Sequence, residues 1–108
     1  MNQGDVFWCR FAPPDKRRPV VVLTRTRALG FLNRIVVAAV TTNIRGIGSE
    51  VPLTRADGMP EECVVTLDNI HTVDVRSLET QITVLSRPQM QLVRKAIEHA
   101  LGFREMSR

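Results

Sequence analysis

Features that direct a chain to the cell envelope are missing from this sequence of 108 residues. No apolar run approaches the roughly 20 residues that a membrane-spanning helix needs. The start lacks the basic region followed by an apolar one that a secretory signal requires. The two cysteines, Cys9 and Cys63, are too few for a disulfide framework. We therefore expect a cytoplasmic protein, with no membrane contact, whose thiols are reduced and buried.

Signatures of several enzyme classes are also missing. The sequence has no P-loop, no Rossmann glycine pattern and no G-x-S-x-G motif. Its soft metal ligands are Cys9, Cys63, His71 and His99, which lack C-x-x-C spacing and fall on separate predicted elements. Buried thiols and ordinary histidines explain these residues better than a zinc site does. We expect neither a metal nor another cofactor.

Acidic residues are the minority among the charged ones. There are 15 Lys+Arg against 11 Asp+Glu, a net charge of +4, and 13 of the cations are arginine. Such a balance favours a nucleic acid or an acidic protein as the partner. The planar guanidinium group also suits phosphate better than an ammonium group does. An arginine-rich genome would produce the same bias, so composition alone does not decide between these explanations.

Alternation and continuous apolar runs predict strands along most of the chain. The expected strands are residues 4–11, 19–24, 35–40, 50–53, 62–67, 70–75 and 78–85. The continuous runs at 19–24 and 35–40 should be buried on both faces. Turn-forming residues predict connections at 12–15, 25–34, 44–49 and 55–60, and Asp68–Asn69 should separate two strands.

One helix is predicted at the end of the chain. Ser86 and Gln89 have the spacing of a capping box, with Pro88 in the first turn. Apolar residues then recur with helical spacing until Gly102, a natural stop. We expect a single α+β domain, with the helix lying on a small β-barrel. Its core should span about residues 4–103, and residues 104–108 should fray.

Three cations, Lys16 to Arg18, run directly into Pro19 and an apolar strand. Proline is tolerated at the first residue of a strand, and it favours an extended backbone at Arg18. Arg18 is then held at the mouth of a rigid strand, where its guanidinium can donate two parallel hydrogen bonds to a phosphate. On these residues alone, a solvated basic loop is the simpler interpretation.

Polar residues stand at the ends of three predicted strands: Arg18 enters one, while Thr41 and Asp68 leave two others. If the two longest apolar strands pair antiparallel, Arg18 and Thr41 lie beside each other at one rim of the barrel. An arginine, a hydroxyl and a carboxylate suffice for RNA cleavage without a metal, because the ribose 2′-OH attacks its own phosphate. DNA, which lacks that hydroxyl, would be refused.

Four segments, in order, resemble the motifs of the MazF/PemK toxin family. They are Gly4–Trp8, Arg18–Val22, Ile35–Thr41 and Leu67–Asp74, and residues 86–103 are similar to the family's C-terminus. The resemblance covers about residues 4–103. It implies an SH3-like barrel (CcdB/PemK-like), a homodimer, and cleavage of single-stranded RNA at a short sequence to give a 2′,3′-cyclic phosphate and a 5′-hydroxyl. It also implies a MazE-like antitoxin as partner.

The same resemblance assigns site residues. It implies that Arg18, Thr41 and Asp68 are catalytic. Trp8 is expected to pack rather than to stack on a base, although stacking is physically available. The pattern departs from the family at Thr66, where the PemK-like branch has an arginine, and in a shorter loop at residues 12–17. The residues expected to hold RNA are Lys16, Arg17, Arg25, Arg27, Asn43 and Arg45.

A second function remains open from the sequence. CcdB-type toxins share this fold and poison DNA gyrase without enzymatic activity, and fold alone does not decide function. The pairing of Arg18 with Thr41 favours the nuclease.

Overall fold

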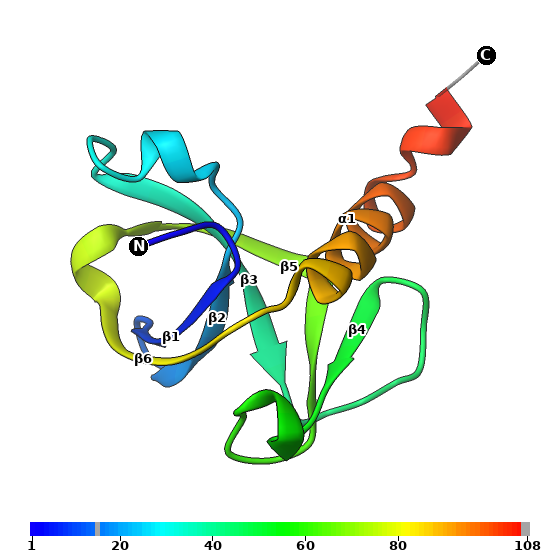
Figure 1. Cartoon of the computed structure of the whole chain (residues 1–108), viewed down its shortest axis with the longest axis horizontal. Coiled ribbons are helices and arrows are strands. Elements are labelled where there is room, and N and C mark those ends of the chain that lie inside the picture. Colours follow the sequence, from blue (N-terminus) through cyan, green and yellow to red (C-terminus); the bar gives the residue numbers. More distant parts are fainter. Residues whose placement is uncertain (15, 107–108) are drawn as a thin grey trace.

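The computed structural model describes residues 1–14 and 16–106, which form one curled antiparallel sheet and a C-terminal helix (Figure 1). The strand order is β4-β5-β3-β2-β1-β6, so β4 and β6 are the two edges of a half-barrel. The α+β class and the C-terminal helix are confirmed, whereas the expected barrel is open between these edges. The strands are β1 (Asp5–Arg10), β2 (Arg17–Val22), β3 (Arg34–Thr41), β4 (Glu50–Leu53), β5 (Cys63–Asp74) and β6 (Leu78–Val84).

The antiparallel hairpin of β2 and β3 forms the centre of the sheet. Val20 pairs with Ala39 and Val22 with Val37, and most side chains of these strands are buried because the sheet carries apolar clusters on both faces. Val36 is an exception to the predicted two-sided burial, since it is 37% exposed.

The prediction of two separate strands at residues 62–67 and 70–75 is wrong, because both belong to the single strand β5. It runs without interruption from Cys63 to Asp74, but its register against β3 jumps: Ala38 pairs with Ile70 and Ala39 with Thr66. Residues 67–69 therefore form a bulge. Asp68 and Asn69 are good turn residues, and a bulge accommodates them while the strand continues.

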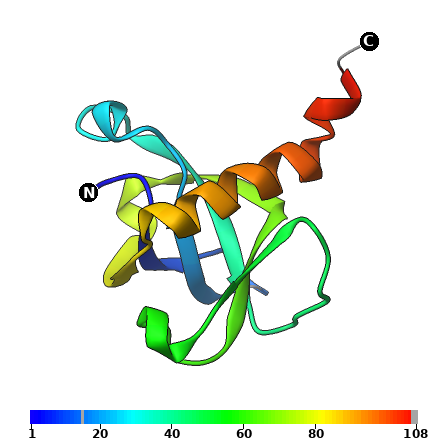
Figure 2. The ribbon, with the colours of Figure 1, turned by 45° about the vertical axis from the view of Figure 1, so that its right-hand side comes forward.

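Helix α1 (Arg87–Leu101) crosses over the sheet and packs on β4 and β5 (Figure 2). The capping box is confirmed: the Gln89 N–H donates to Ser86 Oγ at 3.2 Å, and the Ser86 N–H donates to Gln89 Oε1 at 2.8 Å. Gly102 ends the helix with a φ of 69°, a backbone conformation that glycine adopts without steric cost. In the part of the chain that the structure describes, no helix is long and apolar enough to span a membrane.

Residues 103–106 form a short 3₁₀ helix, and residues 107 and 108, the last of the segment predicted to fray, lie outside the described residues. Asp15, the last residue of the predicted 12–15 turn, also lies outside them. Cys9 and Cys63 are buried and unpaired, as predicted. The remaining short helices are η1 (Thr26–Ala28), η2 (Arg55–Asp57), η3 (Val75–Ser77) and η4 (Phe103–Met106).

Candidate active site

A pocket of about 270 Å³ lies where β2 begins and β3 ends. Arg18 and Thr41, both half-buried, are among its lining residues. The recorded register ends at the pair Val20–Ala39, and its extension by two residues would set Arg18 opposite Thr41. The structure thus brings together the two residues that the antiparallel argument predicted to be neighbours. The complete lining is Trp8, Arg17, Arg18, Pro19, Val40, Thr41, Thr42, Met59, Pro60, Glu61 and Cys63.

The hydroxyl of Thr41 has a defined orientation. Its oxygen accepts a hydrogen bond from the backbone N–H of Asn43 at 3.1 Å. A threonine hydroxyl has one donor and two acceptor positions, so the proton stays available for a phosphate oxygen in the pocket. Arg18 lines the same pocket, where its guanidinium can donate hydrogen bonds to that phosphate.

Trp8 lines this pocket and pairs with Pro19 at the start of β2, and the expectation that it packs rather than stacks on a base stays a prediction. The Arg17 guanidinium lies 4.3 Å from the centroid of the Trp8 ring. The Arg17 Nε also donates to Glu79 Oε1 at 2.8 Å, and Arg10 Nε lies 2.9 Å from Glu79 Oε2. Glu79 of β6 thus holds two arginines of neighbouring strands, and one of them fixes the tryptophan ring.

The loop between β3 and β4, which carries Asn43 and Arg45, is fixed by a carboxylate. Glu50, whose side chain is 2% exposed, accepts from the backbone N–H of Arg45 at 3.0 Å and of Gly46 at 2.8 Å. Burial raises the pKa of Glu50, but the backbone N–H groups of Gly46, Arg45 and Ile47 outweigh it and hold this pKa below its ordinary value. The charged carboxylate therefore acts as an anchor for the loop.

Asp68 faces this same loop from the bulge of β5. Its carboxylate accepts a hydrogen bond from Ser49 Oγ and lies 3.9 Å from an Arg45 guanidinium nitrogen. The structure does not place Asp68 in the pocket lining with Arg18 and Thr41. It connects Asp68 instead to the segment that follows Thr41.

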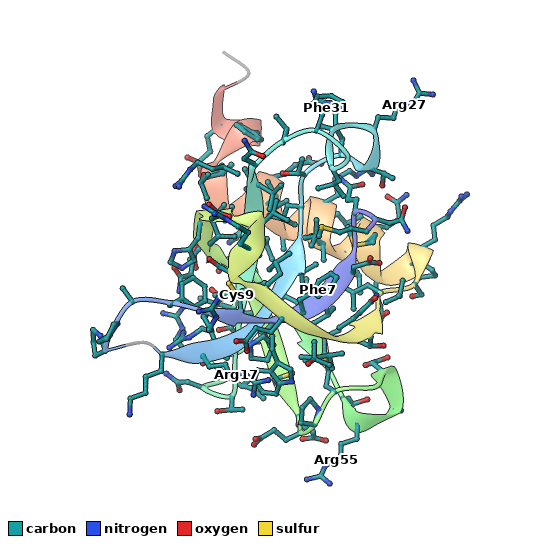
Figure 3. The ribbon with its side chains drawn as sticks, turned by 90° about the vertical axis from the view of Figure 1, so that its left-hand side faces the viewer. Phe7, Cys9, Arg17, Arg27, Phe31 and Arg55 are labelled. Atoms are coloured by element: carbon teal, nitrogen blue, oxygen red, sulfur yellow. The ribbon has the colours of Figure 1, made fainter. Side chains whose placement is uncertain are left out.

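The predicted RNA-binding cations fall at two ends of the molecule. Lys16 and Arg17 stand at the start of β2, beside the pocket, whereas Arg25 and Arg27 follow the end of β2. Figure 3 shows Arg27 at the opposite end from Arg17. Because β2 and β3 are antiparallel, only the loop after Thr41 adjoins the pocket, and the loop after Val22 does not.

The segment from Met59 to Cys63, which has no motif in the sequence, closes the pocket from the side of β5. Met59 and Cys63 are both buried in the larger apolar cluster. Burial, with the charges of Glu61 and Asp57, raises the pKa of Cys63 to about 11. The thiol is therefore a neutral wall residue at physiological pH. Nothing local in the sequence predicts this arrangement, since it depends on the tertiary position of the segment.

Metal ligands do not gather in the part of the chain that the structure describes: no group of at least three His, Cys, Asp or Glu side chains there could hold an ion. His71 contacts Phe11 in a tilted ring arrangement, with ring centroids 5.1 Å apart and an interplanar angle of 54°. His99 lies on α1 against Gly48. Neither histidine lines the pocket.

Comparison with known proteins agrees with this fold. The family described as PemK-like, MazF-like toxin of type II toxin–antitoxin system matches residues 2–101. The probable endoribonuclease MazF5 of Mycobacterium tuberculosis is 40% identical over 100 residues, covering 92% of this chain and 91% of that protein. The chain belongs to the PemK-like, MazF-like family of toxins.

Solved structures give the same result. The Mycobacterium tuberculosis toxin MazF-mt6 superposes with a TM-score of 0.84 at 34% identity, covering 91% of this chain and 96% of that one. A MazE–MazF structure from Deinococcus radiodurans has a TM-score of 0.78 at 27% identity, covering 94% and 95%. The resemblance noted in the sequence is therefore confirmed over nearly the whole chain.

Proposed function

We propose that this toxin is an endoribonuclease that cleaves single-stranded RNA at the pocket of Arg18 and Thr41, without a metal or cofactor. The observation that carries the proposal is the juxtaposition of these two residues at the rim of the β2–β3 hairpin. The name of the Mycobacterium tuberculosis relative, an endoribonuclease, supports the reaction class. The toxin would act in the cytoplasm, because that is where its RNA substrate is.

The proposed reaction uses the substrate's own nucleophile. The ribose 2′-oxygen loses its proton and bonds to the adjacent phosphorus, the bond from phosphorus to the 5′-oxygen breaks, and that oxygen gains a proton. The products are a 2′,3′-cyclic phosphate and a 5′-hydroxyl. Arg18 binds the phosphate and stabilises the charge that develops on it, and Thr41 donates its hydroxyl proton to a non-bridging oxygen. Both groups act more strongly on the transition state than on the ground state.

Residues around the pocket would hold the rest of the strand. Lys16 and Arg17 lie at one side, and Asn43 and Arg45 lie on the loop at the other. We assign Asp68 a positioning role in catalysis, because it contacts Ser49 and Arg45 of that loop rather than the pocket. Arg25 and Arg27, at the far end of β2, would contact only a distant part of the RNA.

We also propose that the toxin is a homodimer. A groove of about 580 Å³ between α1 and the sheet is lined mainly by apolar side chains, among them Val36, Ile70 and Leu101. Val36 is 37% and Leu101 52% exposed, and apolar patches of this kind mark interfaces. A second copy would bury the same patch on both protomers. Light scattering should give the mass of a dimer, and V36D should shift it to that of a monomer.

An acidic, MazE-like antitoxin is the second partner that we propose. The Deinococcus radiodurans neighbour is named as a MazE–MazF structure, and this chain carries a net charge of +4. Carboxylates of such a partner would compete with RNA phosphates for the arginines of the pocket, and the association should be fast and salt-sensitive. Titration of the neighbouring gene's product into a cleavage assay at two salt concentrations tests this. A tight partner that leaves cleavage unchanged would contradict it.

The function itself is tested by incubating the toxin with RNA in excess EDTA and analysing the ends of the fragments. We expect 2′,3′-cyclic phosphate and 5′-hydroxyl ends from the wild-type chain and no cleavage by R18A. R55A is the matched control, because Arg55 is exposed on η2 and outside the pocket lining. A wild-type protein that cuts no RNA but inhibits DNA gyrase would establish the CcdB-like alternative.

A further inference from the structure

The pocket contains a group that phosphate binding does not explain. Glu61 is the one carboxylate among the described residues that line it, and it stands in the same lining as Arg17 and Arg18. A negative charge beside a phosphate site repels the RNA backbone. It is therefore useful only if it contacts a different part of the substrate. The remaining parts are the ribose and the base, and the other walls of the pocket distinguish between them.

The walls are those of a site for a flat, partly apolar group. Trp8, Pro19, Val40, Met59 and Pro60 provide apolar walls, and the volume of about 270 Å³ accommodates one nucleobase. Proteins that bind single-stranded RNA stack its bases on aromatic side chains and read the exposed base edges with polar groups. Trp8 and Glu61 are the two kinds of residue that such a site needs.

We propose that this pocket is a nucleobase subsite in which Trp8 stacks on a base and Glu61 selects one that carries an exocyclic amino group, against uracil. This inference rests on the proposed function, since it specifies a base next to the phosphate that Arg18 binds. The ligand class is an adenine, cytosine or guanine nucleotide within a single strand.

Trp8 is held in place for this role. The Arg17 guanidinium covers one face of its ring at 4.3 Å and is itself fixed by Glu79 at 2.8 Å. In this proposal the base stacks on the face of the ring that Arg17 leaves uncovered. The charge of Arg17 is shared with a carboxylate, so it acts on the orientation of the ring more than on the RNA phosphates.

Glu61 is equally well positioned, because it lies between two buried anchors, Met59 and Cys63. The preceding turn is also fixed: Asp57 Oδ1 accepts from Gln89 of α1 at 2.7 Å, and the Asp57 carbonyl accepts from Thr83 of β6 at 2.8 Å. A segment pinned at both ends loses little entropy when it contacts a ligand.

The same turn leaves no room for a larger residue. Gly58 has a φ of +95°, and a Cβ there would stand 2.7 Å from Thr83 Oγ1. Glu61 thus follows a turn whose position is set by hydrogen bonds to β6 and α1.

The selectivity follows from hydrogen-bond chemistry. An ionised carboxylate only accepts hydrogen bonds. Adenine, cytosine and guanine each offer an amino group on the base edge, and glutamate accepts from such groups. Uracil offers a single N–H between two carbonyl oxygens, which repel a carboxylate. A glutamine at this position would donate as well as accept, and it would fit uracil.

The only tryptophan of the chain is Trp8, so its fluorescence reports directly on stacking. The probes are short 2′-O-methyl homopolymers of uridine, cytidine and adenosine, which cannot be cleaved because the 2′-oxygen is blocked. For the wild-type toxin we expect quenching with an affinity about tenfold higher for the cytidine and adenosine probes than for the uridine probe, as one charge-assisted hydrogen bond would give.

Glu61→Gln should abolish this preference, and Glu62→Gln is its matched control. Glu62 is the adjacent exposed carboxylate and lies outside the pocket lining. Equal base preference in wild type and E61Q, or an equal change in E62Q, would overturn the subsite. So would an E61Q variant that loses kcat with unchanged base preference. Wild-type RNA cleavage in EDTA is measured in parallel. If the wild type cleaves RNA but shows no preference among the base probes, the subsite proposal is wrong and the proposed function stands.

Discussion

The substitution Thr41→Val tests the hydroxyl in the pocket with the least change of shape. Valine keeps the β-branched side chain that the end of β3 accommodates and removes the hydroxyl. A hydrogen bond to a charged group contributes about 1.5–3 kcal/mol, so kcat should fall by about 10- to 150-fold, since each 1.36 kcal/mol is a factor of ten. KM should change little, because the bond is made mainly in the transition state.

The variant also loses a structural contact, which needs its own control. Thr41 Oγ1 accepts from the Asn43 N–H at 3.1 Å, and Thr24 Oγ1 accepts from the Val36 N–H at 2.8 Å at the other end of the hairpin. T24V is therefore a matched control for stability, because each substitution should lower the free energy of unfolding by about 1 kcal/mol. Single-turnover cleavage and thermal melts separate the two effects. Equal kcat in T41V and T24V, or a change in KM alone, would refute the catalytic role of this hydroxyl.

Three further predictions concern charge. Arg18→Lys should lower kcat about a hundredfold or more, because a point charge does not reproduce the bidentate guanidinium; single-turnover rates near wild type would count against this. Glu79→Gln should release its two arginines, tighten RNA binding and steepen the salt dependence of log Kd by about 0.7 for each added phosphate contact; an unchanged slope contradicts it. Hydrogen bonds from the Arg76 side chain lower the pKa of Asp74 from 3.8 to about 2, so its stabilisation is complete above about pH 4 and is lost as the pH falls towards 2. D74N should therefore differ from wild type in melting temperature at pH 6 and much less at pH 2.

The central strands were predictable because their physical signal is local. The apolar run after Pro19 and the run from Ile35 can be satisfied only by burial, and an antiparallel pairing of the two then places Arg18 opposite Thr41. The same pairing puts Arg25 and Arg27, two of the residues predicted to hold RNA, at the other end of the hairpin. The bulge at Asp68 was read as a strand end, because Asp-Asn favours turns and bulges alike.

The rest of the site depends on contacts between distant parts of the chain. The stack of Arg17 on Trp8 requires Glu79 from the last strand. Likewise, the position of Glu61 depends on how Met59 packs in the core. No local spacing or motif predicts these contacts, because each joins residues that are far apart in the sequence and meet only in the folded chain.

The most direct test of the central claim, that Arg18 and Thr41 act together on one phosphate, is a double-mutant cycle. Single-turnover cleavage rates would be measured in EDTA for wild type, R18K, T41V and the double variant, with folding checked by thermal melts. If both side chains stabilise the same transition state, the double variant should be impaired much less than the product of the two single losses, because residues that act as a unit are non-additive. Strictly multiplicative losses would mean that the two residues act independently and would contradict the account.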